Sequence, residues 1–567
     1  MKLIIKQYLS SLKERNELDV LLPDLLAMMD LNVFSKPSIG TRQYGVDVAA
    51  FGRIDSKPEK VYLFSIKGGD LGRKDWNSGR EQDLQPSLND IITTYIPTHL
   101  PSMYQNKPIE VCICFGGNLK ESARLSVAQY EGTHQTKDLT FSEWGGDKLT
   151  QLIEKYFLNE NLLPKDFQSM LRKSLALIDE PTASYKHFSQ LVFALSDAKT
   201  DKNRIKSLRQ LRISLGILIA WCKEADNLES AYLSSELAIL HAWELAKPSF
   251  DKTTKDATAM HESQSSIVSA YWSLCANFLQ EKILPHIDKK YALSQAIHPL
   301  NRVDTNLKIF DLLGRVAMQG IWLQQWILTT EQNNKKYYLE LVEQRDKYYS
   351  YVKQLIINNP MLFTPYKDEQ AIDIAIAIYF LMHDEKSINY VHDYLLEMLN
   401  RINFNFNIHS NYPCNIDEYH KLIEHPLEKT EEYRKENTKG SILYSYIAFF
   451  AAVLDFDDIY KIVQDFKKEK LQHCNFQLWY PDEISEEMFY KNEGTHGVAL
   501  NNIFVDRDKE GFLKQLYDEC EATPSFNNMS AIKLGYDPII FLGCRHYRLP
   551  IPIFLLIKHK PQSKNRN

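Results

Sequence analysis

The pattern of the sequence changes at about residue 159, and this change limits the folds that the chain can adopt. Before it, helical periodicity alternates with short apolar runs typical of strands; after it, long amphipathic segments dominate. These helical segments cover residues 167–178, 185–195, 205–223, 228–246, 263–279, 307–326, 335–357, 369–381 and 390–401. The sequence therefore predicts an α/β N-terminal domain followed by a large, mainly α-helical region.

A chain of 567 residues is long enough for several domains. We expect an N-terminal domain over residues 1–160, a helical domain over 161–405 and a mostly helical C-terminal domain over 406–567. Segment 228–246 resembles one unit of a helical-hairpin repeat, but no period of about 34 or 40 residues is sustained.

Several classes of protein are excluded by composition. A net charge of −6 excludes a basic nucleic-acid coat, although a local basic patch would suffice for phosphate contacts. The eight cysteines are scattered without a C-x-x-C pair, which is typical of buried thiols in a reducing compartment. The longest apolar stretches are too short to span a bilayer, and the start of the chain lacks the features of a signal peptide. These features predict a soluble cytoplasmic protein without a membrane partner.

The N-terminal domain is expected to contain a helix, two strands, a helical segment, two further strands and a closing helix. The predicted elements are a helix over 18–29, strands over 45–51, 61–67, 109–115 and 139–141, and a helix over 147–157. Turn residues between the first two strands favour an antiparallel hairpin.

Two charged residues interrupt the apolar strands of this hairpin. Asp47 lies on the first strand, and Lys67 closes the second. Ser65 and Lys67 are two positions apart and therefore point to the same face, whereas Phe64 and Ile66 point to the other. A lysine in such a strand is costly to bury without a partner, and Asp47 is a natural one.

A carboxylate beside a lysine suits phosphodiester hydrolysis. The carboxylate can bind a hard divalent cation such as Mg²⁺, which polarises phosphate and lowers the pKa of bound water. The lysine can stabilise charge that develops in the transition state. The backbone carbonyl of Ile66 and an acid from the preceding helix would complete the metal site. Glu17 is the first choice for that acid, with Asp19 and Asp24 as alternatives.

At these residues the sequence resembles the PD-(D/E)xK restriction-endonuclease-like superfamily, particularly its Mrr-like members. The family's G-x-D corresponds to Gly45-Val46-Asp47, and the end of its (D/E/Q)-x-K motif corresponds to Ile66-Lys67. The resemblance covers about the first 160 residues, including Lys67-Gly68-Gly69-Asp70 and the strand and helix over 139–157. It implies an endonuclease that depends on Mg²⁺ or Mn²⁺ and acts on DNA. Glu17, Asp47 and Lys67 would be catalytic, and Glu17, Asp47 and Ile66 would hold the metal.

Ser65 departs from this pattern, because it stands where the family usually has Glu, Asp or Gln. Serine is a weaker metal ligand, so the departure leaves open a ligand that binds through water, a less active site, or an inactive one. An RNase with the same site also remains open. The alternative without a nuclease is a solvent-facing Asp47 and an edge-strand Lys67 that discourages aggregation.

The family resemblance also implies a biological setting. Nuclease domains of this type fused to long helical regions often serve bacterial defence against phage or plasmid DNA. The helical region would then sense a trigger, bind a protein partner or form a homo-oligomer. The rival hypothesis is an inactive nuclease-like fold that serves as a nucleic-acid-binding or scaffold protein. Arg73, Lys74, Trp76 and Arg80 follow the site and suggest either contacts to a nucleic-acid backbone or a solvated loop.

Overall fold

The computed structural model describes residues 2–37, 43–55, 57–156, 167–297, 301–330, 334–425, 427, 429–492 and 499–558. The chain divides into two compact units. The first comprises Met1–Ala238 and Pro248–Ile267, and the second comprises Ile239–Lys247 and Val268–Asn567. The finer division into three domains stays a prediction, and its first boundary, at residue 160, lies outside the described residues.

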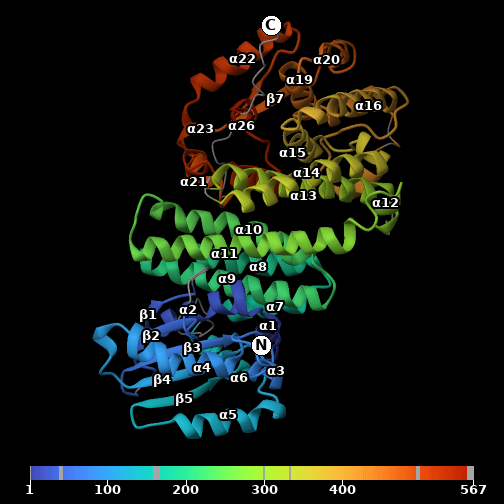
Figure 1. Ribbon diagram of the computed structural model, residues 1–567. Helices are drawn as coiled ribbons and strands as arrows, with labels where there is room; N and C mark the ends of the chain where they lie inside the picture. Colours follow the sequence, from blue (N-terminus) through green and yellow to red (C-terminus); the bar gives the residue numbers. More distant parts are fainter. Residues whose placement is uncertain are drawn as a thin grey trace. The chain divides into compact units, whose positions relative to one another are not determined.

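A five-stranded mixed sheet forms the centre of the α/β part of the first unit (Figure 1). The strand order is β1-β2-β3-β4-β5, with antiparallel pairing of β1 with β2 and of β2 with β3, and parallel pairing thereafter. The strands are β1 (Asn32–Ser35), β2 (Val48–Gly52), β3 (Lys60–Lys67), β4 (Ile109–Phe115) and β5 (Leu139–Trp144). The four predicted strands are confirmed. Strand β1 was not predicted, because its four residues show no clear alternation of apolar and polar side chains.

Helices pack around this sheet. One apolar core lies between the sheet and the segments that connect its parallel strands: α3 (Arg73–Trp76), α4 (Leu84–Asp90), the π-helix Ile91–His99 and α5 (Glu121–His134). Trp76 is a member of this core, 6% exposed and edge-on to Tyr130, so its ring is not available for stacking on bases. The remaining helices, α1 (Lys2–Ser11), α2 (Asp19–Met28) and α6 (Gly146–Tyr156), pack on one another.

The first unit also contains helices from beyond the α/β segment. These are α7 (Phe167–Ala176), α8 (Pro181–Ser196), α9 (Asp201–Glu224) and the first-unit parts of α10 (Glu229–Ala246) and α11 (Lys255–Phe278). A buried carboxylate joins α9 to α2, because Asp24 lies 3.2 Å from Nε of Arg209 and 2.9 Å from Nη2 of Arg212. This ion-pair cluster fixes α9 against the helix that precedes the sheet.

The second unit is largely helical. Its helices are α12 (Ala292–Ala296), α13 (Arg302–Thr329), α14 (Lys335–Asn358), α15 (Ala371–Leu381), α16 (Ile388–Asn407), α17 (Tyr419–Glu424), α18 (Glu431–Asn437), α19 (Leu443–Val453), α20 (Asp457–Glu469), α21 (Ser485–Met488), α22 (Lys509–Ala522), α23 (Ser525–Asn528), α24 (Ser530–Lys533), α25 (Asp537–Tyr547) and α26 (Ile553–Lys558). A small sheet, which the sequence did not predict, contains β6 (Gly440–Ser441), β7 (Asn475–Tyr480) and β8 (Ala499–Asn502).

The coarse expectation of an α/β region followed by a mainly helical one is confirmed. Every amphipathic segment predicted from the sequence lies wholly or mainly within a helix. Among the described helices, none combines the length and the apolar character that a membrane crossing requires.

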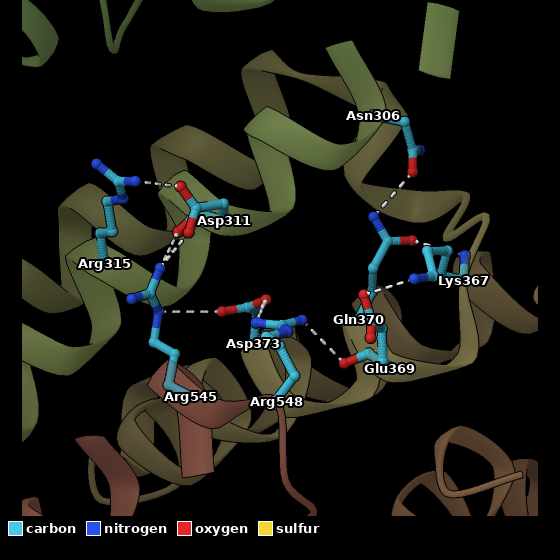
Figure 2. Close-up of polar contacts among 9 residues, drawn as sticks. All are labelled: Asn306, Asp311, Arg315, Lys367, Glu369, Gln370, Asp373, Arg545 and Arg548. Atoms are coloured by element: carbon cyan, nitrogen blue, oxygen red, sulfur yellow. Dashed lines mark hydrogen bonds and ion pairs between the residues drawn. The ribbon is translucent and has the colours of Figure 1, made fainter. Parts of the chain in front are cut away.

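Buried charges join three helices of the second unit (Figure 2). Asp373 on α15 forms an ion pair with Arg545, whose Nε lies 3.2 Å from its carboxylate, and accepts a hydrogen bond from Nη1 of Arg548 at 2.9 Å. Arg545 also pairs with Asp311 on α13, which lies 2.7 Å from Nη2 of Arg315. Burial alone would raise the pKa of Asp311, but Arg315 and Arg545 outweigh it and hold that pKa at about 2.

Gly314 makes room for this network. A Cβ at this position would lie 1.9 Å from Oδ1 of Asp373 and 2.9 Å from Nε of Arg545. We therefore expect Gly314→Ala to displace the Asp373–Arg545 pair and to lower the free energy of unfolding by about 3 kcal/mol, the usual cost of breaking a buried pair. Urea unfolding followed by circular dichroism measures this loss.

Gly132→Ala is the matched control. Gly132 is exposed inside α5, and a Cβ there meets no described atom within 4 Å. Alanine is the better helix former by about 0.5–1 kcal/mol, so this variant should be slightly stabilised. Equal stability of wild type and Gly314→Ala would contradict the role given to the glycine.

Candidate active site

The β2–β3 hairpin places Asp47 and Lys67 at one end of the sheet, where both line the same pocket. The N–H of Asp47 donates to the carbonyl of Phe64 at 2.8 Å, and Val48 pairs with Phe64 in the antiparallel register. The regular register begins at Val48, so Asp47 is the residue just before β2, and its N–H meets the same Phe64 that pairs with Val48. Lys67 closes β3, and both residues line one pocket at this end of the hairpin. The predicted antiparallel hairpin is confirmed, whereas the common face expected from strict alternation stays a prediction, because the ladder is irregular at Asp47.

The glycine of the G-x-D motif has a steric role. Gly45 has a φ of +79°, which favours glycine, and a Cβ there would lie 2.0 Å from the carbonyl oxygen of Ser87 on α4. A side chain at this position would push α4 away from the hairpin. Gly45 therefore allows α4 to form one side of the site.

The carboxylate of Asp47 is held in an electrostatically unfavourable position. Its Oδ2 accepts from the backbone N–H of Ile66 at 2.7 Å. Burial raises the pKa of Asp47 to about 6. The Ile66 N–H and Lys67 act to lower this pKa, whereas the charges of Glu14 and Asp19 act to raise it further. Around neutral pH the site therefore holds negative charge that an added cation would stabilise.

Glu14, rather than the predicted Glu17, is the helix acid that meets Lys67. Nζ of Lys67 lies 3.3 Å from both carboxylate oxygens of Glu14. Glu17 instead accepts from the backbone N–H of Lys13 at 2.7 Å, and it is absent from the described residues that line the pocket. The assignment of Glu17 to the site is thus replaced by Glu14 in the geometry, although the chemical roles stay predictions.

A glycine after β3 explains why Glu14 can approach. A Cβ on Gly68 would lie 2.9 Å from the backbone nitrogen of Glu14. The chain before α2 passes directly over Gly68 in a short π-helix, Glu14–Leu18, so Glu14 is brought next to Lys67. The pair Gly68-Gly69 after Lys67 was the available sequence signal, but it did not identify which segment would pack there.

The two alternative helix acids have different surroundings. Asp24 is buried and paired with Arg209 and Arg212 of α9, so its charge is already compensated. Asp19 lines the same pocket as Asp47 and acts on the Asp47 pKa. The acids that surround Asp47 are therefore Glu14 and Asp19.

A pocket of about 920 Å³ opens at these residues. Its described lining includes Glu14, Asp19, Asp47, Ile66 and Lys67. Carboxylate oxygens are the ligands that Mg²⁺ prefers, and Mg²⁺ usually keeps several waters while binding one or two carboxylates. Asp47 and Glu14 suit such a site. Among the described residues, no three His, Cys, Asp or Glu side chains are grouped closely enough to hold a metal ion by themselves.

Comparisons with known proteins do not identify a family for the chain. No family model matches it, and neither a curated protein nor a solved structure shows significant similarity.

The raised pKa of Asp47 predicts a stability that depends on pH. The pKa of this carboxyl is about 6 in the folded protein and about 3.9 in the unfolded chain. Between these two pH values the folded state binds more protons than the unfolded state, so the free energy of unfolding falls as the pH rises through this window. Asp47→Asn keeps an acceptor for the Ile66 N–H and removes the charge. It should stabilise the protein by about 1–2 kcal/mol at pH 8, and this gain should vanish below about pH 4.

Asp24→Asn is the control for this measurement. Both are aspartates of the first unit, but Asp24 neutralises two arginines, so its replacement should destabilise the protein by about 1–3 kcal/mol at pH 8. Urea unfolding of both variants across pH 4–8 makes the comparison. A loss of stability in Asp47→Asn at pH 8 would contradict the electrostatic description of the site.

Proposed function

We propose that the first unit is a metal-dependent nuclease that hydrolyses phosphodiester bonds in DNA, as the PD-(D/E)xK resemblance implies. The observation that carries the proposal is the meeting of Asp47, Glu14, Asp19 and Lys67 around one pocket at the end of the β2–β3 hairpin. An aspartate and a lysine could have faced solvent independently. Their shared pocket, with two further acids, supports a chemical role.

Asp47 and Glu14 are the residues that would hold Mg²⁺ or Mn²⁺. The cation would supply polarisation of the phosphate and activation of a water. Glu14 would also compensate for Ser65, which stands where the family usually has an acid or Gln. The Ser65 side chain is buried, with 1% of it exposed. The second carboxylate comes from the chain before α2 and replaces the acid that the motif lacks on β3.

Lys67 supplies positive charge to the same place. Its side chain is 13% exposed and is held by Glu14, so the ammonium has a fixed position beside Asp47. An ammonium placed in advance can stabilise negative charge that develops on a phosphate oxygen, at little cost in reorganisation. Binding of a cation by Glu14 would weaken the ion pair and leave Lys67 able to face the substrate.

The second unit would control this activity. A nuclease without regulation damages its host, which supports a role for the helical unit in sensing a trigger, binding a partner or forming a homo-oligomer. Defence of a bacterial cell against phage or plasmid DNA is the setting that the resemblance implies.

Cleavage assays test the proposal. Linear duplex, closed circular duplex and single-stranded circular DNA are each incubated with the full chain, with Mg²⁺, with Mn²⁺ or with EDTA. We expect cleavage that requires the metal and that falls at least about 100-fold in Asp47→Ala and in Lys67→Ala, because each removes a charged group from the site. A parallel series with RNA separates a DNase from an RNase.

Lys60→Ala is the matched control for Lys67→Ala. Lys60 is a half-buried lysine at the other end of β3, paired with Glu110 at 2.9 Å. It should retain full cleavage. Cleavage that persists in Asp47→Ala or Lys67→Ala would remove these residues from the mechanism, and metal-independent binding without cleavage would favour the non-catalytic alternative.

Metal binding has a readout that does not require activity. A cation that binds only the folded site raises stability, by about 2.7 kcal/mol at a hundredfold excess over its dissociation constant. We expect Mn²⁺ to raise the melting temperature of the wild type and to have no such effect on Asp47→Asn. An equal rise in both proteins would place the bound metal elsewhere.

A further inference from the structure

A helix from far along the chain forms one wall of the candidate active site. Glu262, Ser263, Ser265 and Ser266 of α11 line the same pocket as Asp47. These residues belong to the part of α11 that lies in the first unit. The site is thus bounded by the hairpin and by a polar helix that the N-terminal α/β segment does not itself contain.

One ion pair links this wall to the segment after β1. Nζ of Lys36 lies 2.6 Å from the carboxylate of Glu262. Both partners are about half exposed, so this pair contributes little stability. The buried Arg212–Asp24 pair at 2.9 Å, which also borders the pocket, joins α9 to α2 more firmly. Both α9 and this part of α11 belong to the first unit.

The residues that line the pocket carry an excess of negative charge, which disfavours binding of two phosphate backbones. The described lining includes seven carboxylates, against four basic groups. Three of the basic groups, Lys36, Lys67 and Arg212, are already in ion pairs with carboxylates. Proteins that bind duplex DNA neutralise many phosphates with Lys and Arg. A second strand in this pocket would meet carboxylates and serine hydroxyls.

We propose, building on the nuclease function above, that the pocket admits a single nucleic-acid strand, as a strand end or an unpaired segment, and excludes continuous duplex. A volume of about 920 Å³ lies within the range of pockets that enclose a small ligand, and it suits a short stretch of one strand. Enzymes that act on a base likewise take an unpaired or extruded nucleotide into a pocket, because the target atom cannot be reached inside the duplex. The polar wall of α11 sets the preference, and the cation at Asp47 would supply the attraction for one phosphate.

Matched oligonucleotides test the preference on the full chain. A single strand, a blunt duplex of the same sequence, the duplex with an unpaired tail and a covalently closed duplex are compared with Mn²⁺ present. We expect the strand and the tailed duplex to be cleaved at least about tenfold faster than the other two. Equal or faster cleavage of the closed duplex would overturn the inference.

A binding measurement distinguishes an error in the single-strand proposal from an error in the proposed nuclease function. Fluorescence anisotropy in Mn²⁺ with Lys67→Ala, which should cleave at least about 100-fold more slowly but keeps both carboxylates of the proposed metal site, measures the affinity for the strand and the blunt duplex. Absence of metal-dependent cleavage with tighter binding of the strand would overturn the nuclease function and support the single-strand pocket. Tighter binding of the blunt duplex would overturn the pocket's assignment whether or not cleavage occurs.

A bulky side chain on the wall provides a second test. Ser265 is exposed and lines the pocket, so Ser265→Trp should narrow it without disturbing the core. We expect the KM for the single strand to rise at least about fivefold while the melting temperature is unchanged. Thr258→Trp is the control, because Thr258 is exposed on the same helix and is absent from the described lining. Equal KM values for the two variants would show that α11 does not bound the substrate.

Discussion

The candidate site of the first unit depends on the free-energy cost of holding an ionised carboxylate at the end of a buried hairpin. Burial of the Asp47 carboxylate raises its pKa to about 6, and the neighbouring acids Glu14 and Asp19 add to this effect. The hydrogen bond from the Ile66 N–H and the charge of Lys67 lower the pKa, but they do not offset the cost of burial. Such a site loses stability at neutral pH for as long as it is ionised, and a divalent cation would reverse that loss. The energetic cost and the proposed chemistry therefore have one origin.

Close approach of backbone segments gives this site its shape. Gly45 lets α4 reach the hairpin, and Gly68 lets the chain before α2 bring Glu14 to Lys67. In the second unit, Gly314 has the same role, because it leaves space for Asp373 and Arg545. At Gly68 and Gly314 the missing side chain allows charged groups to meet at short range. Such contacts are sensitive to a single added methyl group, since packed interiors have little free volume.

The local pattern of the sequence was sufficient for the hairpin and for the long helices. Alternation around Asp47 and Lys67 predicted both strands, because side chains in a strand alternate. The irregular ladder at Asp47 was beyond this pattern. The same reasoning failed for α5, whose buried residues Ala123, Val127 and Tyr130 form a narrow apolar stripe. It also predicted Glu17 as the helix acid, with Asp19 and Asp24 as alternatives, and Glu14 was not among them. Helical periodicity begins after Glu14, and the π-helix that presents this residue has no periodic signal.

The sequence by itself determined the succession of an α/β region and a helical region, the hairpin, and the presence of an aspartate and a lysine in its two strand segments. These features follow from spacings of a few residues, which local backbone geometry converts directly into secondary structure. Only the tertiary structure decided that Glu14 meets Lys67, that Asp24 is neutralised by α9, and that α11 walls the pocket. Those contacts join residues far apart in the chain, and their formation depends on how whole helices pack, which no local pattern encodes.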